Sequence, residues 1–489
     1  MRPDPLATAP LSSVMSGLDL YPFLSRFSDY FAKSYERWRR GRILRFLRRV
    51  DPDTLEKISE RLAVTAFQQA AERVPYYRDL LHSKGIDPAL IRKAADFRRL
   101  PLLEKEIFYE ADIADLALDG DLESIKNILT SSGFSGKFGF GANSADNLRN
   151  TARMIDFVLD MIFEIGRKKT LVISCLPMGV KMYTNLALLA EVSVREDMAL
   201  ALVRKFQKHV DQIIIVGEAF FLKRLAEEGI RSGIDWPSLP VSLVCGEDSF
   251  PETYRDYVGG LLGISHDVWP MERMIGSSLG IAEVDLNLFH ETPETIRIRR
   301  LAERDEKFRK LIFGEELDVT PMLFHYYPHR TFLELDVAGE IIVTTLVPCQ
   351  IPLIRYNTKD AGRLISYRAL ESALKEYDRI DLLPTLHLPL AAVKSRHAGS
   401  APHTKIADHV RRAMFSDPEV AKRVTGYFKI LDGAGGKQID LQMEKYFSSE
   451  TDRQEIAAGL NVEGAKINPI PYYQFPEALT LDYNKKFRH

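Results

Sequence analysis

The chain has 489 residues, of which 45% are hydrophobic and 27% are charged, and its formal net charge at pH 7 is −2. This length exceeds one ordinary hydrophobic core, so we expect two or more domains, and the composition is typical of a soluble globular protein. The near-neutral charge argues against a general nucleic-acid-binding protein, and no apolar run reaches the ~18 residues of a transmembrane segment.

The cysteines and the N-terminus indicate the compartment. The chain has three cysteines, Cys175, Cys245 and Cys349, which lie far apart and show no CxxC spacing. This pattern predicts reduced thiols rather than a disulfide framework or a sequence-local zinc site. The N-terminal residues lack the short apolar core of a secretory signal, so the sequence predicts a cytoplasmic protein.

A basic helix is predicted near the N-terminus. Residues 1–20 are irregular in pattern, whereas residues 21–50 follow a helical pattern in which arginines alternate with apolar residues. The arginines are Arg37, Arg39, Arg40, Arg42, Arg45, Arg48 and Arg49, interleaved with Trp38, Ile43, Leu44, Phe46 and Leu47. Such a helix can lie on an anionic membrane, dock a partner, or pack in the protein with a solvated arginine face. The sequence leaves these readings open.

The next clear elements are a helix and a strand that leads into a polar loop. Residues 54–74 predict an amphipathic helix, which ends at Val74 because Pro75 lacks an amide donor and crowds the preceding turn. Residues 125–129 are strand-like. The loop that follows combines hydroxyl groups, glycines and a lysine: Thr130, Ser131, Ser132, Gly133, Phe134, Ser135, Gly136 and Lys137.

This loop suits the phosphates of a nucleotide. Glycines let backbone N–H groups turn toward an anion, hydroxyl groups add donors, and Lys137 supplies a positive charge. The loop is not a Walker A loop, since only Phe134 and Ser135 separate Gly133 from the Gly136-Lys137 pair. From loop chemistry alone, an ordinary Ser/Gly turn with a solvated lysine is the alternative.

From residue 170 onward, apolar strands alternate with helices. Strands are predicted over 170–174, 212–216 and 241–245, with a helix over 220–229. Strands joined by helical crossovers predict a largely parallel sheet that is buried on both faces, and hence an α/β fold. Further on we expect a hairpin (331–336 and 340–345, turning at Gly339), a connecting region over 365–390, and a small α+β unit. That unit contains a helix over 404–415 and strands over 425–431 and 437–443.

Several segments also occur in a particular order along the chain. They are Ala71–Arg78, Lys84–Asp87, Leu100–Lys105, the Thr130–Lys137 loop, Val244–Glu247, Met274–Gly280 and Ile351–Asp360. This order resembles the phenylacetate–CoA ligase branch of the adenylate-forming enzymes, which includes the coenzyme F synthetase-like and capsule-biosynthesis proteins. The resemblance spans residues 65–365. It implies the adenylate-forming fold: a helical extension (1–60), a large α/β domain with the ATP and acyl sites (61–390), and a small α+β C-terminal lid (391–489).

The resemblance also implies a nucleotide site. The Thr130–Lys137 loop would cradle the β- and γ-phosphates of ATP. Asp360, expected just beyond an apolar strand, would accept hydrogen bonds from both ribose hydroxyls. Two further segments would line the nucleotide. Gly246, Glu247 and Asp248 would lie on the adenine side, and Gly276, Ser277 and Ser278 would also contact the nucleotide. Arg355 could meet either a phosphate or a structural carboxylate.

The lid carries the second implied catalytic lysine. The C-terminal tail resembles the closing Gly-Lys-x-x-Arg of the family, with Lys485 at the lysine and Arg488 at the arginine. Lys485 would stabilise the charge that develops between the attacking carboxylate and the α-phosphate. Lys486 is the other candidate for this role. Alternatively, the tail is an ordinary basic C-terminus in solvent. The hinge region, residues 393–397, lacks the acidic pair that the family shows there.

The metal motif is degenerate. Where the family has Tyr-Gly-x-x-Glu, Ile275 replaces the aromatic residue that stacks on adenine and Leu279 replaces the glutamate that binds Mg²⁺. Glu283 would offer a substitute carboxylate if the chain becomes helical after Gly280. The sequence leaves open a displaced metal ligand, an altered enzyme, or a relative that binds a nucleotide without full turnover.

Together these features predict an enzyme that uses ATP and Mg²⁺ to activate a small aryl or acyl carboxylic acid as an acyl-adenylate. The acyl group would then pass to the thiol of CoA or of a carrier protein, or to an amine. Met178, Tyr183 and Ile275 are candidates for the acyl pocket. The alternatives are a divergent adenylate-fold protein that binds a ligand or partner, and an acyl-transfer subunit. The basic helix would then serve for partner docking, and a homodimer is also compatible with the sequence.

Overall fold

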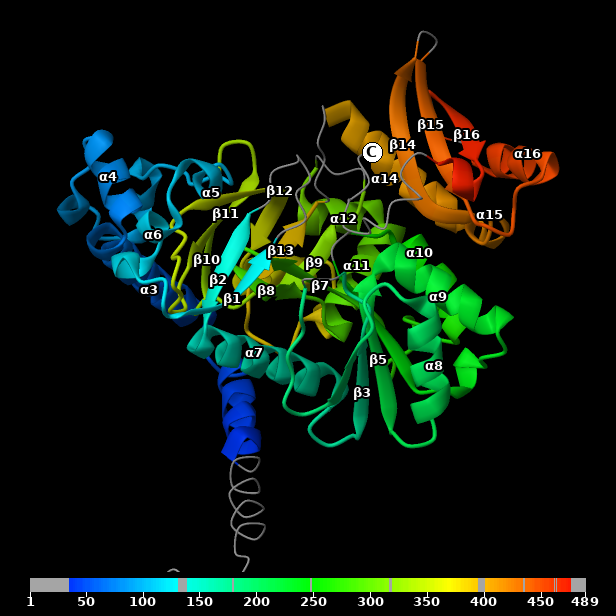
Figure 1. The fold of residues 1–489 in the computed structure, drawn as a ribbon, viewed down its shortest axis with the longest axis horizontal. Helices are drawn as coiled ribbons and strands as arrows, with labels where there is room; N and C mark the ends of the chain where they lie inside the picture. The colour runs from blue at the N-terminus through cyan, green and yellow to red at the C-terminus, as the bar shows by residue number, and fades with distance from the viewer. Residues whose placement is uncertain are drawn as a thin grey trace, which may run out of the picture. The chain divides into compact units, whose positions relative to one another are not determined.

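The computed structural model describes residues 35–130, 139–177, 180–246, 249–315, 319–394, 401–433, 436–460, 462 and 464–475. The chain divides into two units, Met1–Arg49 and Val50–His489. Figure 1 labels the helices and strands of the described residues. In the first unit residues 35–47 are helical, which confirms the described part of the predicted basic helix. The domain boundaries at residues 60 and 390 stay predictions. Within the described part of the chain, no helix is long and apolar enough to span a membrane.

The second unit begins with two helices whose boundaries follow from their end residues. Helix α3 (Pro52–Arg73) starts where the Asp51 side chain accepts a hydrogen bond from the Thr54 amide at 3.1 Å. It stops at Val74 as predicted, and Pro75 opens α4 (Pro75–Ser83). Short helical turns continue the chain: η2 (Pro88–Leu90), η3 (Ala94–Arg99), α5 (Ile107–Glu110), α6 (Ile113–Leu116) and η4 (Leu118–Gly120).

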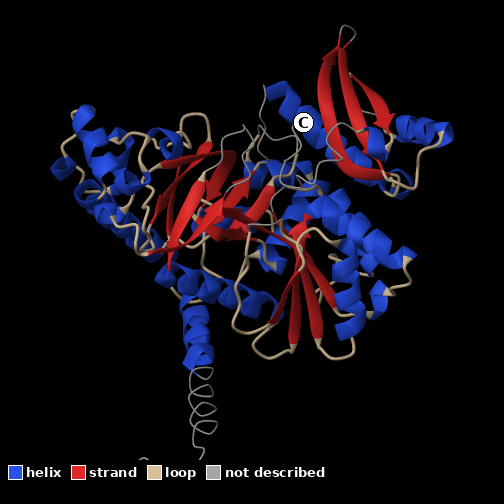
Figure 2. Ribbon diagram, viewed as in Figure 1, coloured by secondary structure: helices blue, strands red, loops and turns tan. Residues whose placement is uncertain are grey.

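Over the described residues the main sheet has eleven strands, in the order β10-β11-β12-β13-β9-β8-β7-β6-β5-β3-β4. Figure 2 draws the strands in red and the helices in blue. One half is parallel: β3 (Thr170–Ser174), β4 (Leu188–Glu191), β5 (Gln212–Glu218), β6 (Val241–Gly246) and β7 (Ile275–Ile281). The other half is antiparallel: β8 (Asp285–His290), β9 (Met322–His325), β10 (Thr331–Leu335), β11 (Glu340–Thr345), β12 (Tyr356–Ile365) and β13 (Leu390–Val393).

The parallel half is covered by helices on both faces, as the apolar runs predict. Along β5, Ile214 and Val216 pack in the cluster that contains residues of α7 (Ala145–Phe163). Ile213 and Ile215 point the other way, into the core shared with α8 (Glu196–Phe206) and α9 (Ala219–Arg231). Because successive side chains of a strand alternate between faces, a strand covered on both sides is apolar throughout.

Further helices complete the large domain, and one region differs from its prediction. These helices are α10 (Glu252–Leu262), α11 (Pro293–Arg304), α12 (Glu306–Phe313), α13 (Tyr367–Glu376), and the short turns η5 (Trp236–Ser238) and η6 (Ile380–Leu382). Residues 365–390 were expected to be a connecting region, and this was wrong. They contain α13 and lead into β13, which lies between β12 and β9. A four-residue strand whose partners come from elsewhere in the chain leaves little local pattern.

The small C-terminal part is an α+β unit, as predicted. Its sheet consists of β14 (Val424–Gly433), β15 (Gly436–Met443) and β16 (Ala465–Ile470), with β14 antiparallel and β16 parallel to β15. The helices are α14 (Ala401–Ser416), α15 (Pro418–Ala421), α16 (Glu450–Gly459) and the turn η7 (Tyr472–Gln474). The predicted helix over 404–415 and both predicted strands are therefore confirmed.

Candidate nucleotide site

The polar loop lies at the tip of a two-stranded hairpin. Strand β1 (Ile125–Thr130) pairs antiparallel with β2 (Phe140–Ser144), and Thr130 lies opposite Phe140. Thr130 is exposed at the end of its strand. The other loop residues of the prediction lie outside the described residues: Ser131, Ser132, Gly133, Ser135, Gly136 and Lys137. Their phosphate-binding role stays a prediction, while the strand before them is confirmed.

The loop end of this hairpin packs against the turn between β7 and β8. A side chain at Gly139 would overlap the carboxylate of Glu283, and one at Gly141 would overlap the carbonyl oxygen of Ala282. Glycine is needed at position 141, where the neighbour is backbone, whereas at position 139 the neighbour is the end of a side chain that can shift. The chain just after the predicted phosphate loop therefore touches the turn that carries Glu283, the predicted metal ligand.

Glu283 is buried at this contact with a lysine as its counter-ion. Its Oε1 lies 3.6 Å from Nζ of Lys105, which belongs to the Leu100–Lys105 segment. The condition named for Glu283, a helix after Gly280, is not met: β7 continues to Ile281, and a turn leads directly into β8. The carboxylate nevertheless lies beside Gly139, at the base of the predicted phosphate loop.

The residues at this turn do not fit a magnesium site by themselves. Over the described ranges, no three His, Cys, Asp or Glu side chains are arranged to hold a metal ion. The Leu279 side chain has no oxygen atom that could bind a metal ion, and the charge of Glu283 is already offset by Lys105. Mg²⁺ needs several oxygen ligands in near-octahedral geometry. The role of Glu283 as a metal ligand therefore stays a prediction.

The second predicted nucleotide segment lies at the carboxyl end of β6 and along β7. Cys245 pairs with Ser277 in the parallel ladder, so Gly246 comes next to Ser278, and a Cβ on Gly246 would lie 4.0 Å from the Ser278 carbonyl oxygen. Gly276 lies in β7 opposite Val244. Glu247 and Asp248 lie outside the described residues. Ligands of open α/β sheets bind at this edge, where parallel strands end.

The backbone of β7 is held from behind by two buried side chains that the sequence did not single out. The Ile275 carbonyl accepts a hydrogen bond from the Arg255 guanidinium, and the Ile275 amide donates to Nε2 of His266 at 2.9 Å. Burial lowers the pKa of His266 to about 3, so its ring is neutral and Nε2 can accept. The strand that carries Gly276, Ser277 and Ser278 is thereby fixed in place.

Arg255 belongs to a buried network of charges. Its guanidinium donates to Glu291 at 2.9 Å and to Glu252 at 3.0 Å, and Arg299 donates to Glu252 at 2.6 Å. Burial alone would raise the pKa of Glu252, but Arg255, Arg299 and Arg300 outweigh it and lower that pKa to about 2. On a helix, Glu252 and Arg255 have the i, i+3 spacing of an ordinary surface pair, so only the fold reveals their burial.

Asp360 is buried within β12, so the expectation that it stands just beyond a strand was wrong. Strand β12 bulges here: Asn357 pairs with Ile342, whereas Ala361 pairs with Glu340. Lys359 has a left-handed φ of 61°, and its amide donates to the Asn357 side chain at 2.8 Å. Bulges re-aim side chains and are frequent next to active sites. The ribose-binding role of Asp360 stays a prediction.

The segment that carries Lys105 is tied to β12. The Leu103 amide donates to the Arg355 carbonyl at 3.0 Å, and the Asn357 amide donates to the Leu103 carbonyl at 2.8 Å. Arg355 Nε donates to Glu334 at 3.2 Å, so this guanidinium meets a structural carboxylate. Phe108, just after the segment, packs against Phe140 of the hairpin at 4.8 Å between ring centroids. Strand β12 and the loop end of the hairpin are thus connected through one stretch of chain.

The small C-terminal unit reaches the edge where the parallel strands end. Glu218, the last residue of β5, accepts hydrogen bonds from the amides of Phe220 and Phe221 and caps α9. It also accepts one from the Tyr427 hydroxyl of β14 at 2.9 Å. At Gly426 the backbone has a φ of 104°, and a side chain there would overlap the Phe220 ring.

A buried lysine anchors this contact. Lys223 of α9 has no exposed side-chain surface, and its ammonium donates to the Val424 carbonyl at 2.6 Å, to Glu227 at 3.0 Å and to Glu444 at 3.3 Å. Two of these partners belong to the C-terminal unit. The predicted lid lysine Lys485, its rival Lys486 and Arg488 lie outside the described residues.

The candidate acyl-pocket residues give a mixed result. Ile275 is fully buried in the main core and Tyr183 is half-buried. Met178 lies outside the described residues. Which residues contact the acyl group stays a prediction.

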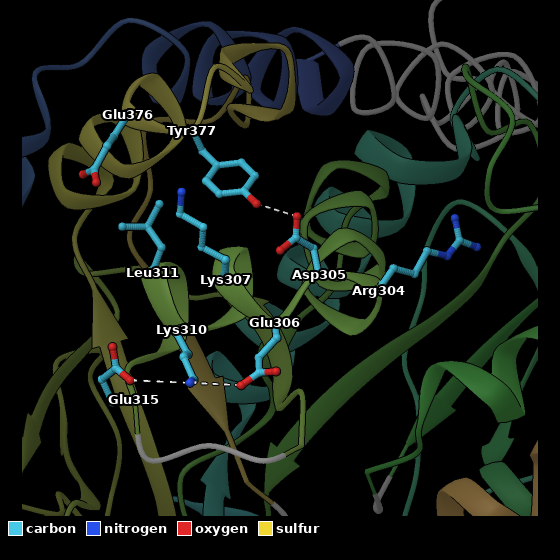
Figure 3. A pocket seen from close by; sticks show the side chains of 9 residues that line it. All are labelled: Arg304, Asp305, Glu306, Lys307, Lys310, Leu311, Glu315, Glu376 and Tyr377. Atoms are coloured by element: carbon cyan, nitrogen blue, oxygen red, sulfur yellow. Dashed lines mark hydrogen bonds and ion pairs between the residues drawn. The ribbon is translucent and has the colours of Figure 1, made fainter.

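A polar hollow lies on other elements. It has a volume of about 840 Å³ and is lined by residues of α11, α12 and α13 and their connections (Figure 3). Lys310 pairs there with Glu306 at 2.9 Å and with Glu315 at 3.7 Å, and the Tyr377 hydroxyl donates to Asp305. These charged groups satisfy one another, so the hollow does not present a concentrated charge to a ligand.

Comparisons with known proteins identify the fold. The sequence matches no protein-family model and no curated protein. The structure is similar to a crystal structure of 2-hydroxyisobutyryl-CoA ligase in the postadenylation state in complex with R3-HIB-AMP, with a TM-score of 0.59, 13% identity and 87% of both chains covered. The chain has the fold of the adenylate-forming ligases.

A second structure of that ligase supports the same conclusion. In complex with 2-HIB-AMP and CoA, in the thioesterification state, it has a TM-score of 0.51 and 14% identity, and 89% of both chains is covered. At these identities the likeness concerns the fold, because one fold can carry different chemistries. The predicted α/β fold with a small C-terminal α+β domain is therefore confirmed.

Proposed function

We propose that this protein is an ATP-dependent carboxylate ligase of the phenylacetate–CoA ligase-like branch. It would convert a small aryl or acyl carboxylic acid to an acyl-adenylate and then pass the acyl group to a thiol or an amine. One observation supports the proposal: Gly139 and Gly141, just after the Thr130–Lys137 loop, lie against the turn that follows strand β7, which carries Gly276–Ser278. The chain segments that flank two parts of the expected nucleotide site are therefore neighbours, in a fold that supports this chemistry.

In the proposed reaction an oxygen of the substrate carboxylate attacks the α-phosphorus of ATP. The bond from that phosphorus to the oxygen that bridges the α- and β-phosphates breaks, and pyrophosphate leaves with the electron pair. We assign the β- and γ-phosphates to the Thr130–Lys137 loop, the ribose to Asp360 and the α-phosphate to Lys485. These groups position the reactants and stabilise charge, so no covalent protein intermediate is needed. No step is routed through Mg²⁺, whose expected donor set is incomplete.

In the second half-reaction, the thiol or amine attacks the acyl carbon and AMP leaves. Both the thiol of CoA and that of a carrier protein suit this chemistry, as does an amine. An amine product would be an amide and a thiol product a thioester, so the mass of the product distinguishes them.

A second function is favoured by one specific feature. Leu279 occupies the position of the metal-binding glutamate, and the described residues hold no group of metal ligands. A protein that binds a nucleotide or an acyl-adenylate without turnover would show this pattern. The two functions predict opposite results in an assay of adenylation.

The test is to trap the activated acid. The protein is incubated with ATP, hydroxylamine and a panel of aryl and acyl acids, and hydroxamates and pyrophosphate are measured. We expect one group of acids to give both products and Lys137→Ala to lose most of the activity. Lys126→Ala, an exposed lysine on the same hairpin, is the matched control and should retain it. Tight ATP binding without hydroxamate from any acid would favour the binding protein.

A further inference from the structure

The basic helix of the N-terminal unit has a composition that the proposed ligase activity does not use. Residues 35–49 contain seven arginines and one glutamate. Glu36 pairs with Arg39 at 3.1 Å, so the segment keeps a strong positive charge. It also belongs to a compact unit of its own, Met1–Arg49.

The exposed side of this segment is built from two kinds of residue only. Of residues 35–49, the exposed positions are all aromatic or arginine: Tyr35, Arg37, Trp38, Arg42, Arg45, Phe46, Arg48 and Arg49. Tyr35 is 58% exposed, and Trp38 and Phe46 are each 51% exposed. Positions 35, 38, 42 and 46 follow helical spacing, so Tyr35, Trp38, Arg42 and Phe46 share one face. In contrast, Arg40 and Leu47 are buried.

The side chains on this face are packed against one another. The Tyr35 and Trp38 rings lie 5.9 Å apart, and the Arg42 guanidinium lies 4.8 Å from the Trp38 ring centroid. Such stacking places positive charge directly beside exposed aromatic surface. We name Tyr35, Trp38, Arg42, Arg45 and Phe46 the aromatic–arginine face, since these exposed residues lie on one side of the helix.

We propose that the aromatic–arginine face binds the surface of an anionic lipid bilayer. Arginine forks match phosphate groups, and Trp and Tyr rings favour the boundary between headgroups and acyl chains. Helices that combine a basic polar surface with aromatic residues lie in this boundary. The charge of the segment is complementary to the lipid headgroups, and Trp38 and Phe46 supply the apolar part of the contact.

A single-stranded nucleic acid fits this face less well. Its recognition relies on rings that are open to stack on successive bases. Here Tyr35 packs on Trp38, and Arg42 covers the Trp38 ring. The arrangement therefore favours lipid over polynucleotide.

The experiment measures binding of the full chain to vesicles. Vesicles of phosphatidylcholine alone are compared with vesicles of phosphatidylcholine mixed with phosphatidylglycerol, by co-sedimentation at low and high salt. We expect binding to the mixed vesicles only, weakened by salt. Arg42→Glu with Arg45→Glu should reduce the partition coefficient at least about tenfold. Arg167→Glu, which replaces an exposed arginine of the other unit, is the control and should change binding little.

Fluorescence tests whether Trp38 enters the boundary. The chain has three tryptophans, Trp38, Trp236 and Trp269, of which Trp236 is buried. Trp269 is 50% exposed and lies 4.5 Å from an arginine, which makes it a matched control for Trp38. Trp38→Ala should weaken vesicle binding, and Trp269→Phe should keep both the binding and a blue shift of emission.

Three results would overturn the proposal. One is equal binding to neutral and anionic vesicles, and another is binding that survives the double charge reversal. The third is the absence of vesicle binding together with salt-sensitive binding of single-stranded DNA, which would make the face a polynucleotide site. Pyrophosphate release by the double variant is measured in parallel, because the proposed ligase activity does not depend on this face.

Discussion

Replacing Lys223 by methionine should destabilise the protein strongly, because this lysine is the cation of a buried cluster. Its side chain has no exposed surface and bonds to Glu227, Glu444 and the Val424 carbonyl. Without the ammonium, each buried carboxylate keeps weaker partners: Glu227 lies 3.7 Å from Arg231 and accepts a hydrogen bond from Tyr257, and Glu444 lies 3.9 Å from Arg224. Removing one partner from a buried ion pair costs about 3–5 kcal/mol. Methionine keeps most of the volume, so the loss measures charge rather than a cavity.

The free energy of unfolding is measured by urea titration, followed by circular dichroism. The control is Lys375→Met, which removes an exposed lysine from an i, i+4 pair with Glu371 and should change stability little. The triple variant Lys223→Met with Glu227→Gln and Glu444→Gln should recover part of the loss, because the two carboxylates that faced the ammonium are then neutral amides. A Lys223→Met protein as stable as Lys375→Met would refute the reasoning.

Three other predictions concern the site and its pH dependence. Asp360→Ala should weaken ATP binding by about 1.5–3 kcal/mol for each charge-assisted hydrogen bond lost, and unchanged affinity in calorimetry would exclude the ribose role. Glu283→Gln should lower adenylation. If Glu283 binds Mg²⁺, the Glu283→Gln variant needs a higher metal concentration for half-maximal activity. If Glu283 only pairs with Lys105, that concentration stays the same, and Lys105→Gln lowers adenylation in the same way. Burial lowers the pKa of both His266 and His325 to about 3, so the folded protein keeps these rings neutral. Their contribution to the free energy of unfolding is complete above pH ~6.5 and is lost as the pH falls toward 3. The loss amounts to about 1.4 kcal/mol per histidine per pH unit. Equal stability to urea at pH 7 and pH 5 would contradict this prediction.

Local patterns predicted the regular elements well. The apolar run of β5 predicted a parallel strand, because a strand that is covered on both faces is apolar throughout. Pro75 predicted the end of α3. The hairpin of β10 and β11 turns at Gly339, whose φ of 78° suits glycine. In each case a few neighbouring residues determine the structure.

The rest depends on contacts between distant segments. The place of β13 in the sheet is set by β9 and β12, which lie far away in the sequence. Lys223 and Arg255 have the spacing of surface charges on amphipathic helices, and burial becomes visible only when the C-terminal unit and β7 pack against them. The bulge around Asp360 likewise requires the partner strand β11. The predicted roles of Lys137 and Lys485 fall outside the described residues and stay predictions.

The most direct test of the proposed function is exchange of labelled pyrophosphate into ATP. Exchange requires reversible formation of an acyl-adenylate, so it reports the first half-reaction without knowledge of the acceptor. We predict exchange that depends on a carboxylic acid, is strongest for one group of aryl or acyl acids, and is lost in Lys137→Ala but kept in Lys126→Ala. The absence of exchange with every acid of a broad panel, in a folded protein that binds ATP, would contradict the ligase function.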